Sequence, residues 1–292
     1  MTLTRFALLF STFLMACDAD KDGLTNSEEE ELGTDPESAD SDGDGIDDAV
    51  EIEQGTDPTN ADSDEDGLSD GEEDQYGSDP LSEDSDGDTY WDAWEVTEGT
   101  DPTDPDSRIY TGYWPYNPDK GDDLPGYDDT NLDEGAPIPE FVLMDRFEDM
   151  VNAYDFQNDT AYVMVDLSAV WCGPCNGFAE WLHGESDSYG FNNYWPNIPG
   201  LVESGDLYWL TVLGENRRGN VPDADDLNAW YESYPDDRIP ILAVEEDISF
   251  TYFFIDSGWP SIYLYNPDLT LNAGPGRSSA QYYQALDIAN DL

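Results

Sequence analysis

Two cysteines three positions apart form the most reactive pair of side chains in this sequence. Cys172 and Cys175 stand in Trp-Cys-Gly-Pro-Cys, where Gly and Pro suit a tight turn that brings both sulfurs within bonding range. The spacing predicts a pair that exchanges disulfides with other thiols. Two other interpretations stay open, a zinc site and a purely structural disulfide, whereas a c-type haem site is excluded by Asn176. A zinc site needs two more ligands and finds only His183, a c-type haem site needs a histidine where Asn176 stands, and a purely structural disulfide needs nothing further.

The residues around this pair predict a strand that runs into a helix. Residues 161–167 form an apolar, β-branched run, and apolar residues at 178, 179, 181 and 182 have helical spacing. The pair therefore stands at a helix N-terminus, where free amides and the helix dipole should favour a Cys172 thiolate. Strand-like and helix-like runs alternate over 136–292, which predicts an α/β domain.

The stretch Val-Asp-Leu-Ser-Ala-Val-Trp-Cys-Gly-Pro-Cys resembles the active site of thioredoxins, and residues 136–292 are similar to the thioredoxin superfamily. The resemblance implies a central sheet flanked by helices. It also implies that Trp171 belongs to the active site and that Asp166 is a buried carboxylate that relays a proton for Cys175. The alternative for Asp166 is a strand-end residue whose oxygens accept from backbone amides.

The same resemblance assigns a cis-proline to the segment Trp-Pro-Ser before a predicted strand at 262–265. Pro260 would face the cysteine pair and leave a backbone edge for a substrate segment, with Pro240 as the alternative. Segments 135–141 and 238–242 look like the TlpA branch of exported disulfide reductases. Two departures leave the substrate open: strand 207–213 lacks a lysine, and 184–205 is an insertion rich in Tyr, Asn and Pro.

A second set of reactive residues recurs in the first third of the chain. Asp18, Asp40, Asp62 and Asp84 open the same pattern, and the differences 40 − 18, 62 − 40 and 84 − 62 are all 22. Each unit places oxygens at loop positions 1, 3, 5, 9 and 12 and a backbone carbonyl at 7, as a calcium loop does. The predicted ligands are Asp18, Asp20, Asp22, Leu24, Asn26 and Glu29; Asp40, Asp42, Asp44, Ile46, Asp48 and Glu51; Asp62, Asp64, Asp66, Leu68, Asp70 and Glu73; and Asp84, Asp86, Asp88, Tyr90, Asp92 and Glu95. Position 6 is Gly in three units and Thr89 in the fourth.

This array, over 18–106, resembles bacterial thrombospondin type 3 repeats. The family implies structural Ca²⁺ and a role in spacing or adhesion. Because dense carboxylates repel one another, we expect the array to be expanded without Ca²⁺ and compact with it. Residues 107–135, rich in Tyr, Pro, Gly and Asp, predict a linker or a packing collar. No organic cofactor is expected.

The N-terminus predicts export. Arg5 precedes an apolar run over 6–16, and Leu-Met-Ala-Cys at 14–17 looks like the lipobox of bacterial lipoproteins. Residues 1–17 would then be a lipoprotein signal, with Cys17 as the lipidated residue. The alternative is an ordinary cleaved signal whose cysteine is incidental.

Net charge limits the partners. Nine Lys and Arg stand against 69 Asp and Glu, for a formal charge of −60. Nucleic acid is therefore a poor partner, since binding it needs clustered basic residues, whereas metal cations suit this field.

Together these features predict a thioredoxin-like α/β fold preceded by an elongated array of calcium-binding loops. The expected function is a membrane-anchored, extracytoplasmic thiol–disulfide oxidoreductase that reduces disulfides of exported proteins. Its partners would be those disulfides or thiols, a membrane electron donor and a membrane reached through the lipid. The alternative is a calcium-binding adhesion or spacer protein whose thioredoxin fold serves binding.

Overall fold

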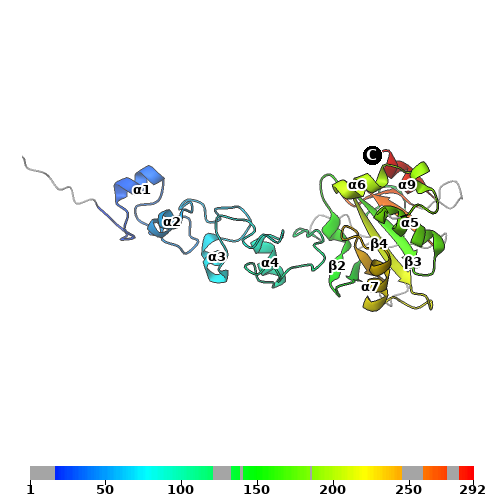
Figure 1. The fold of residues 1–292 in the computed structure, drawn as a ribbon. Helices are drawn as coiled ribbons and strands as arrows, with labels where there is room; N and C mark the ends of the chain where they lie inside the picture. The colour runs from blue at the N-terminus through cyan, green and yellow to red at the C-terminus, as the bar shows by residue number, and fades with distance from the viewer. Residues whose placement is uncertain (1–16, 121–132, 139–140, 185, 245–258, 275–282) are drawn as a thin grey trace, which may run out of the picture. The chain divides into compact units, whose positions relative to one another are not determined.

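A computed structural model describes residues 17–120, 133–138, 141–184, 186–244, 259–274 and 283–292. The chain forms two compact units, Met1–Ile109 and Tyr110–Leu292 (Figure 1). Within the described residues, no helix is long and apolar enough to span a bilayer. The predicted signal over 1–16 lies outside these residues, and Cys17 is exposed with a free thiol.

The first unit contains one short helix in each repeat. The helices are α1 (Asn26–Leu32), α2 (Asp48–Gln54), α3 (Asp70–Tyr76) and α4 (Asp92–Glu98). Each ends at a glycine in the left-handed conformation, which stops the helix after seven residues. At loop position 6, Thr89 has a φ of 91°, in the left-handed region that the glycines of the other loops also adopt. The fourth loop therefore keeps the turn despite the missing glycine.

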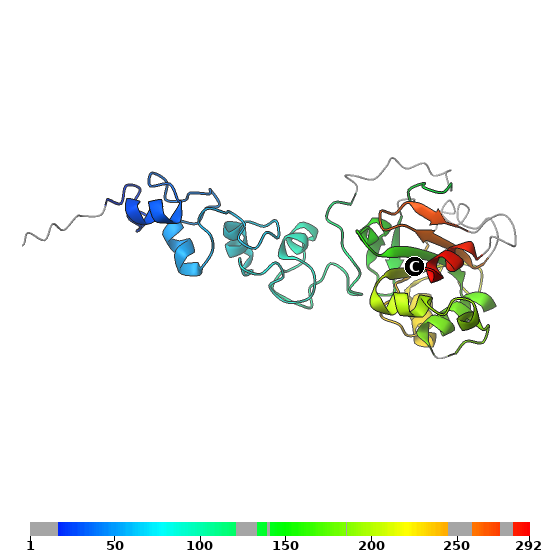
Figure 2. The ribbon, with the colours of Figure 1, turned by 90° about the horizontal axis from the view of Figure 1, so that it is seen from above.

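Hydrogen bonds join successive repeats. The amide of Gly71, at the start of α3, donates to Asp44 Oδ2 at 3.0 Å, and the amide of Ala93 donates to Asp66 Oδ2 at 2.9 Å. In each case a loop aspartate of one repeat binds the helix of the next, and Figure 2 shows these helices in chain order along the unit. In the last repeat the corresponding oxygen, Asp88 Oδ2, lies 3.6 Å from Arg108 Nε. The Arg108 guanidinium thus lies beside the aspartate oxygen that, in the preceding repeats, accepts a helix amide of the next repeat.

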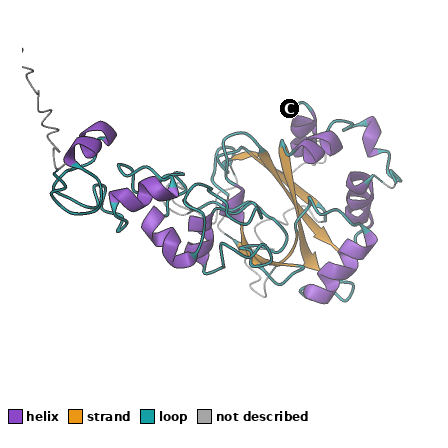
Figure 3. Cartoon of the chain, turned by 60° about the vertical axis from the view of Figure 1, so that its left-hand side comes forward, coloured by secondary structure: helices purple, strands orange, loops and turns teal. Residues whose placement is uncertain are grey.

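The second unit is built on a seven-stranded sheet in the order β2-β1-β5-β4-β3-β6-β7. Figure 3 draws the strands in orange. The three central strands β3, β4 and β5 are parallel, and the others pair antiparallel. The strands are β1 (Val142–Asp145), β2 (Met150–Asn152), β3 (Tyr162–Ala169), β4 (Leu207–Glu215), β5 (Ile241–Ala243), β6 (Ser261–Tyr265) and β7 (Leu271–Ala273). The apolar run at 161–167 and the predicted strands at 207–213 and 262–265 are confirmed as β3, β4 and β6.

Helices pack on this sheet in two buried clusters. The first holds α5 (Gly173–His183), α6 (Ile198–Ser204) and α9 (Gln284–Asn290) against β3, β4 and β6. The second holds α7 (Ala224–Ser233) against the ends of β3, β4 and β5. Two 3₁₀ turns, η1 (Ala153–Phe156) and η2 (Phe191–Asn193), complete the unit. The strand order, with α5 between two parallel strands, is thioredoxin-like, as expected.

Residues 110–120 pack on the α/β domain as a collar. The Tyr110 hydroxyl donates to Asp155 Oδ2 at 2.6 Å, and Trp114 Nε1 donates to Asp145 Oδ2 at 2.7 Å. All four side chains are buried. The compact unit therefore begins at Tyr110, ahead of the boundary predicted at Ala136, while 121–132 lie outside the described residues.

Candidate functional site

The two cysteines of the predicted pair are joined in a disulfide. Cys172 is the N-cap of α5, its Sγ accepts the Cys175 amide at 3.2 Å, and the Cα atoms lie 5.3 Å apart. Pro174 occupies the first helical turn, where no amide donor is needed. Once the pair is reduced, the helix N-terminus would stabilise negative charge on Cys172 Sγ.

Asp166 lies within β3 and is only 2% exposed. Its Oδ1 accepts the Ser168 hydroxyl at 2.8 Å, so its hydrogen-bond partner is a side chain rather than the backbone amides of the alternative interpretation. Burial raises the pKa of Asp166 to about 7, although the Ser168 hydrogen bond lowers it. Such a group can accept and release a proton near neutral pH. Sequence reasoning missed Ser168, although residues two apart on a strand share one face.

The Trp259–Pro260 peptide bond is cis, and it is the only cis bond in the described part of the chain. Pro260, rather than Pro240, therefore has the conformation that the resemblance implies. The register pairs Leu167 with Ser261, which places Pro260 at the end of β3 from which α5 follows. Trp259 packs against the buried cluster that contains both cysteines.

Two side-chain hydrogen-bond arrangements restrain the active-site turn. Trp171, which is 53% exposed, donates from Nε1 to Glu215 Oε2 at 2.9 Å. Asn176 donates from Nδ2 to the Cys172 carbonyl at 2.6 Å, and its Oδ1 accepts the Tyr234 hydroxyl at 2.8 Å. Sequence reasoning missed this second pair, because Tyr234, the C-cap residue after α7, comes from a distant part of the chain.

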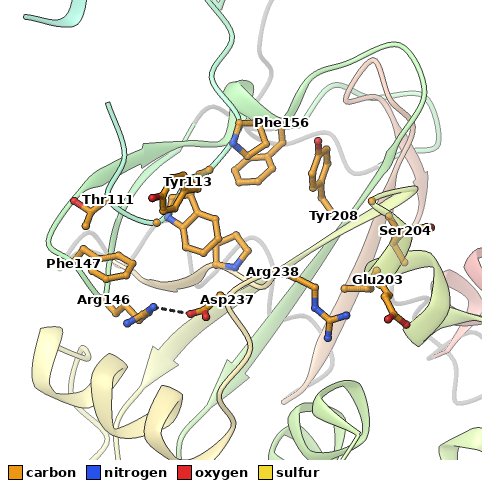
Figure 4. A pocket seen from close by; sticks show the side chains of 17 residues that line it. Thr111, Tyr113, Arg146, Phe147, Phe156, Glu203, Ser204, Tyr208, Asp237 and Arg238 are labelled. Atoms are coloured by element: carbon orange, nitrogen blue, oxygen red, sulfur yellow. Dashed lines mark hydrogen bonds and ion pairs between the residues drawn. The ribbon is translucent and has the colours of Figure 1, made fainter. Parts of the chain in front are cut away.

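Described residues of this unit line at least two hollows. One, of about 660 Å³, lies beside α5 and is lined by Val170, Asn176, Trp230 and Tyr234 together with charged residues of 217–232. The other, of about 550 Å³, lies between the collar and the turn after β1 (Figure 4). In it Arg146 binds Asp237 at 3.1 Å. The second hollow contains none of the active-site residues, so the first is the one adjacent to the chemistry.

The predicted calcium ligands gather in four acidic clusters. In each loop the carboxylates at positions 1, 3 and 5 have oxygens within 4.8 Å of one another. Many of these oxygens are buried and accept no hydrogen bond. The same holds for Oε2 of the position-12 glutamates Glu51, Glu73 and Glu95, whose Oε1 accepts a Thr or Ser hydroxyl. The buried oxygens without donors include Asp20 Oδ2, Asp22 Oδ2, Asp42 Oδ2, Glu51 Oε2, Asp62 Oδ1, Asp64 Oδ2, Glu73 Oε2, Asp86 Oδ2 and Glu95 Oε2. Buried anionic oxygens without donors are what a hard cation requires.

The aspartates at position 9 have a second role. Both oxygens of Asp48 accept from Ser41, one from its amide at 2.8 Å and one from its hydroxyl at 2.7 Å. Ser63 binds Asp70 and Ser85 binds Asp92 in the same way. Asn26 stands at this position in the first repeat, and the serine there is replaced by alanine. The loop start is thus tied to the helix start.

One cluster crosses between repeats. Asp44 and Glu51 of the second repeat bring oxygens within 4.8 Å of Asp70 of the third. The 22-residue pattern predicts four self-contained loops, and this shared cluster differs from that prediction. Burial, then the nearby Asp42 and Asp44 carboxylates, raise the pKa of Glu51 to about 8. These carboxylates repel one another, and a bound cation would remove that repulsion.

The comparisons with known proteins concern the two units separately. The bacterial TSP3 repeat model matches residues 18–38, 40–61, 62–83 and 84–105. The first unit is an array of bacterial TSP3 repeats. No curated protein sequence matches the chain.

Three solved structures are similar to the remainder. The pneumococcal exposed lipoprotein thioredoxin from Streptococcus pneumoniae is 21% identical, with 53% of this chain and 100% of that chain covered and a TM-score of 0.35. A thiol:disulfide interchange protein from Bacteroides sp. is 18% identical, with 55% of this chain and 91% of that chain covered and a TM-score of 0.37. The thioredoxin domain of a thiol-disulfide oxidoreductase from Bacteroides vulgatus is 18% identical, with 55% of this chain and 99% of that chain covered and a TM-score of 0.35. The thioredoxin-like assignment of the second unit rests on its own strand order and on the placement of its disulfide.

Proposed function

We propose that the chain is an extracytoplasmic thiol–disulfide oxidoreductase that reduces disulfides of exported proteins. The observation that supports this proposal best is the Cys172–Cys175 disulfide at the N-terminus of α5, which follows β3, the strand that holds the buried Asp166 with a pKa of about 7. An acid with that pKa is matched to proton transfer at neutral pH.

The reaction proceeds in two exchanges. The Cys172 thiolate attacks one sulfur of the target disulfide, and the other target sulfur leaves as a thiolate. Cys175, after giving its proton to Asp166, then attacks Cys172 Sγ and releases the second target thiol. Two electrons pass to the target, and the cysteine pair ends as the disulfide. A dithiol donor at the membrane must reduce the pair again before the next cycle.

The first experiment tests this exchange in a Cys17→Ser background, so that only the pair can react. The reduced full chain is mixed with glutathione disulfide and followed by mass spectrometry. The parent should form its internal disulfide, Cys172→Ser should stay inert, and Cys175→Ser should trap a mixed disulfide with glutathione. A reduced parent that leaves glutathione disulfide unchanged would contradict the proposal and favour a binding or adhesion role.

Calcium is the proposed ligand of the acidic clusters, and the buried oxygens without donors support that choice. The carboxylates would hold the ions, which would supply positive charge and tie each loop to its helix. Glu51→Gln removes one buried charge, so it should lower the calcium affinity of its site at least about tenfold. Glu53→Gln, exposed on the same helix, is the matched control. Calorimetric titrations with equal affinities for the two variants would refute this ligand assignment.

Attachment to a membrane through lipidated Cys17 is part of the same proposal. Its support is the lipobox-like Leu-Met-Ala-Cys and the exposed free thiol of Cys17. The repeats would then separate the redox unit from the membrane surface.

A further inference from the structure

Residues 187–192 of the insertion pack along the active-site helix. The Phe191 ring stacks on Phe178 of α5 at 4.4 Å between ring centres, and Trp181 Nε1 donates to Asn192 Oδ1 at 2.8 Å. The loop is fixed at its start, because the Asp187 carboxylate accepts the amides of Phe191 at 2.6 Å and of Asn192 at 2.9 Å. The segment is thus an anchored part of the redox unit.

This anchoring brings one tyrosine beside the cysteine pair. The ring of Tyr189 stacks on Phe191, with 5.5 Å between centres and planes 8° apart. It lies against Gly177, where a Cβ would overlap the ring, and its hydroxyl would lie 3.0 Å from a Cβ at Gly173. Because residues four apart share a helix face, the phenol follows that face from Gly177 towards the catalytic turn.

The surface around the disulfide is therefore aromatic. Cys172 itself is only 3% exposed, whereas Trp171 and Tyr189 are 53% and 49% exposed. Gly173 and Pro174 are the exposed residues between the cysteines. Glu215 restrains the Trp171 ring and Phe191 restrains the Tyr189 ring. Because both side chains are already ordered, they lose little conformational entropy when a partner binds.

The nearby carboxylates are already engaged. Glu180 accepts the Ser188 hydroxyl at 3.0 Å, Asp187 binds two amides, and Glu215 binds Trp171. Their negative charge still opposes an acidic segment, in keeping with the charge of the whole chain. An apolar or aromatic side chain of a partner can pack against either exposed ring.

We propose that Tyr189 is a specificity-determining residue and that the preferred targets carry an aromatic side chain next to their reactive cystine. This inference rests on the proposed function and names its substrate class. Tyr189 takes no part in the exchange itself; it binds the flanking residue of the target segment.

The test compares two cystine peptides that differ only in Phe or Ser beside the cysteine, together with glutathione disulfide. With the reduced full chain as the electron donor, Tyr189→Ala should lower the second-order rate constant for the Phe peptide about tenfold and leave those for the Ser peptide and glutathione disulfide within about twofold. Tyr189→Phe should keep the preference. Gly177→Ala should reproduce the loss, because its Cβ displaces the ring while alanine favours the helix.

Tyr194→Ala is the matched control, since Tyr194 is a more exposed tyrosine of the same insertion, at 70%. It should leave all three rates unchanged. An equal loss on all substrates in Tyr189→Ala would mean a structural role and overturn the inference, as would a parent without preference for the Phe peptide. A parent inert towards glutathione disulfide would instead refute the proposed function, and the inference with it.

Discussion

At the scale of single residues, burial sets the acid–base behaviour of Asp166. The carboxyl loses its water inside the sheet, which disfavours the ionised form, and the Ser168 hydroxyl recovers only part of that loss. In the unfolded chain an aspartate has a pKa of about 3.9. The folded state therefore holds its proton over a pH range in which the unfolded state releases it.

This difference predicts how stability varies with pH. Stability from this group is fully present below about pH 4 and is lost as the pH rises to about 7, because the unfolded chain then binds fewer protons. Asp166→Asn cannot ionise and should be the more stable protein at about pH 8, by at most about 4 kcal/mol. At about pH 5 the gain should be much smaller. Thermal unfolding of both oxidised proteins in the same calcium buffer measures the gap, and a gap independent of pH would contradict the argument.

At the scale of elements, the collar of residues 110–120 completes the α/β unit. It brings indole and phenol donors to Asp145 and Asp155, two buried carboxylates on the β1–η1 side of the sheet. Lys120 adds an ion pair to Asp155 at 3.0 Å. Without these donors, the buried carboxylate oxygens of Asp145 and Asp155 that accept from them would have neither water nor a hydrogen-bond donor. Burying a charged oxygen without a partner is unfavourable.

Trp114→Phe tests the collar. The variant keeps an aromatic ring but leaves Asp145 Oδ2 without its indole donor, so it should destabilise the unit by about 1–3 kcal/mol. Trp171→Phe also removes an indole–carboxylate hydrogen bond, but at an exposed site, and should change stability by less than about 0.5 kcal/mol. Urea unfolding followed by circular dichroism gives both values. Equal effects would show that burial at the collar is unimportant.

At the scale of the whole molecule, charge dominates. The chain has a formal charge of −60, and its repeat loops bring carboxylates together in small volumes, while hydrogen bonds such as Gly71 to Asp44 hold successive repeats together. Divalent cations bound in the loops would lower the repulsion where it is strongest. Simple salt would screen it less effectively inside buried clusters.

Calcium should therefore compact the chain. Small-angle scattering of the full chain should show the radius of gyration falling as Ca²⁺ rises to about 10⁻³ M, the range typical of extracellular modules. Sodium chloride at equal ionic strength is the control and should produce a smaller change. Equal contraction in both salts would mean screening without site binding.

Much of this protein could be predicted from its sequence, because the relevant signals are local. The 22-residue step, the alternate acids and the helix-ending glycines specify the repeats through contacts between near neighbours. The apolar run before Trp-Cys-Gly-Pro-Cys likewise specifies β3 and α5, because strand and helix patterns are readable over a few residues. The cysteine pair and its helix N-terminus follow from the same short stretch, whereas the cis bond at Pro260 was expected only from the family resemblance.

Contacts between residues far apart in the sequence could be seen only in the folded protein. The approach of Asp70 to Asp44 and Glu51, the packing of Trp114 on Asp145 and the placement of Tyr189 on Gly173 and Gly177 join segments that carry no mutual signal. Such contacts depend on how complete elements pack, and packing responds to shape and volume across the whole core. The residues that carry the chemistry can therefore be identified from short stretches of sequence. Their environment, including the pKa of Asp166 and the aromatic surface beside Cys172, depends on the tertiary fold.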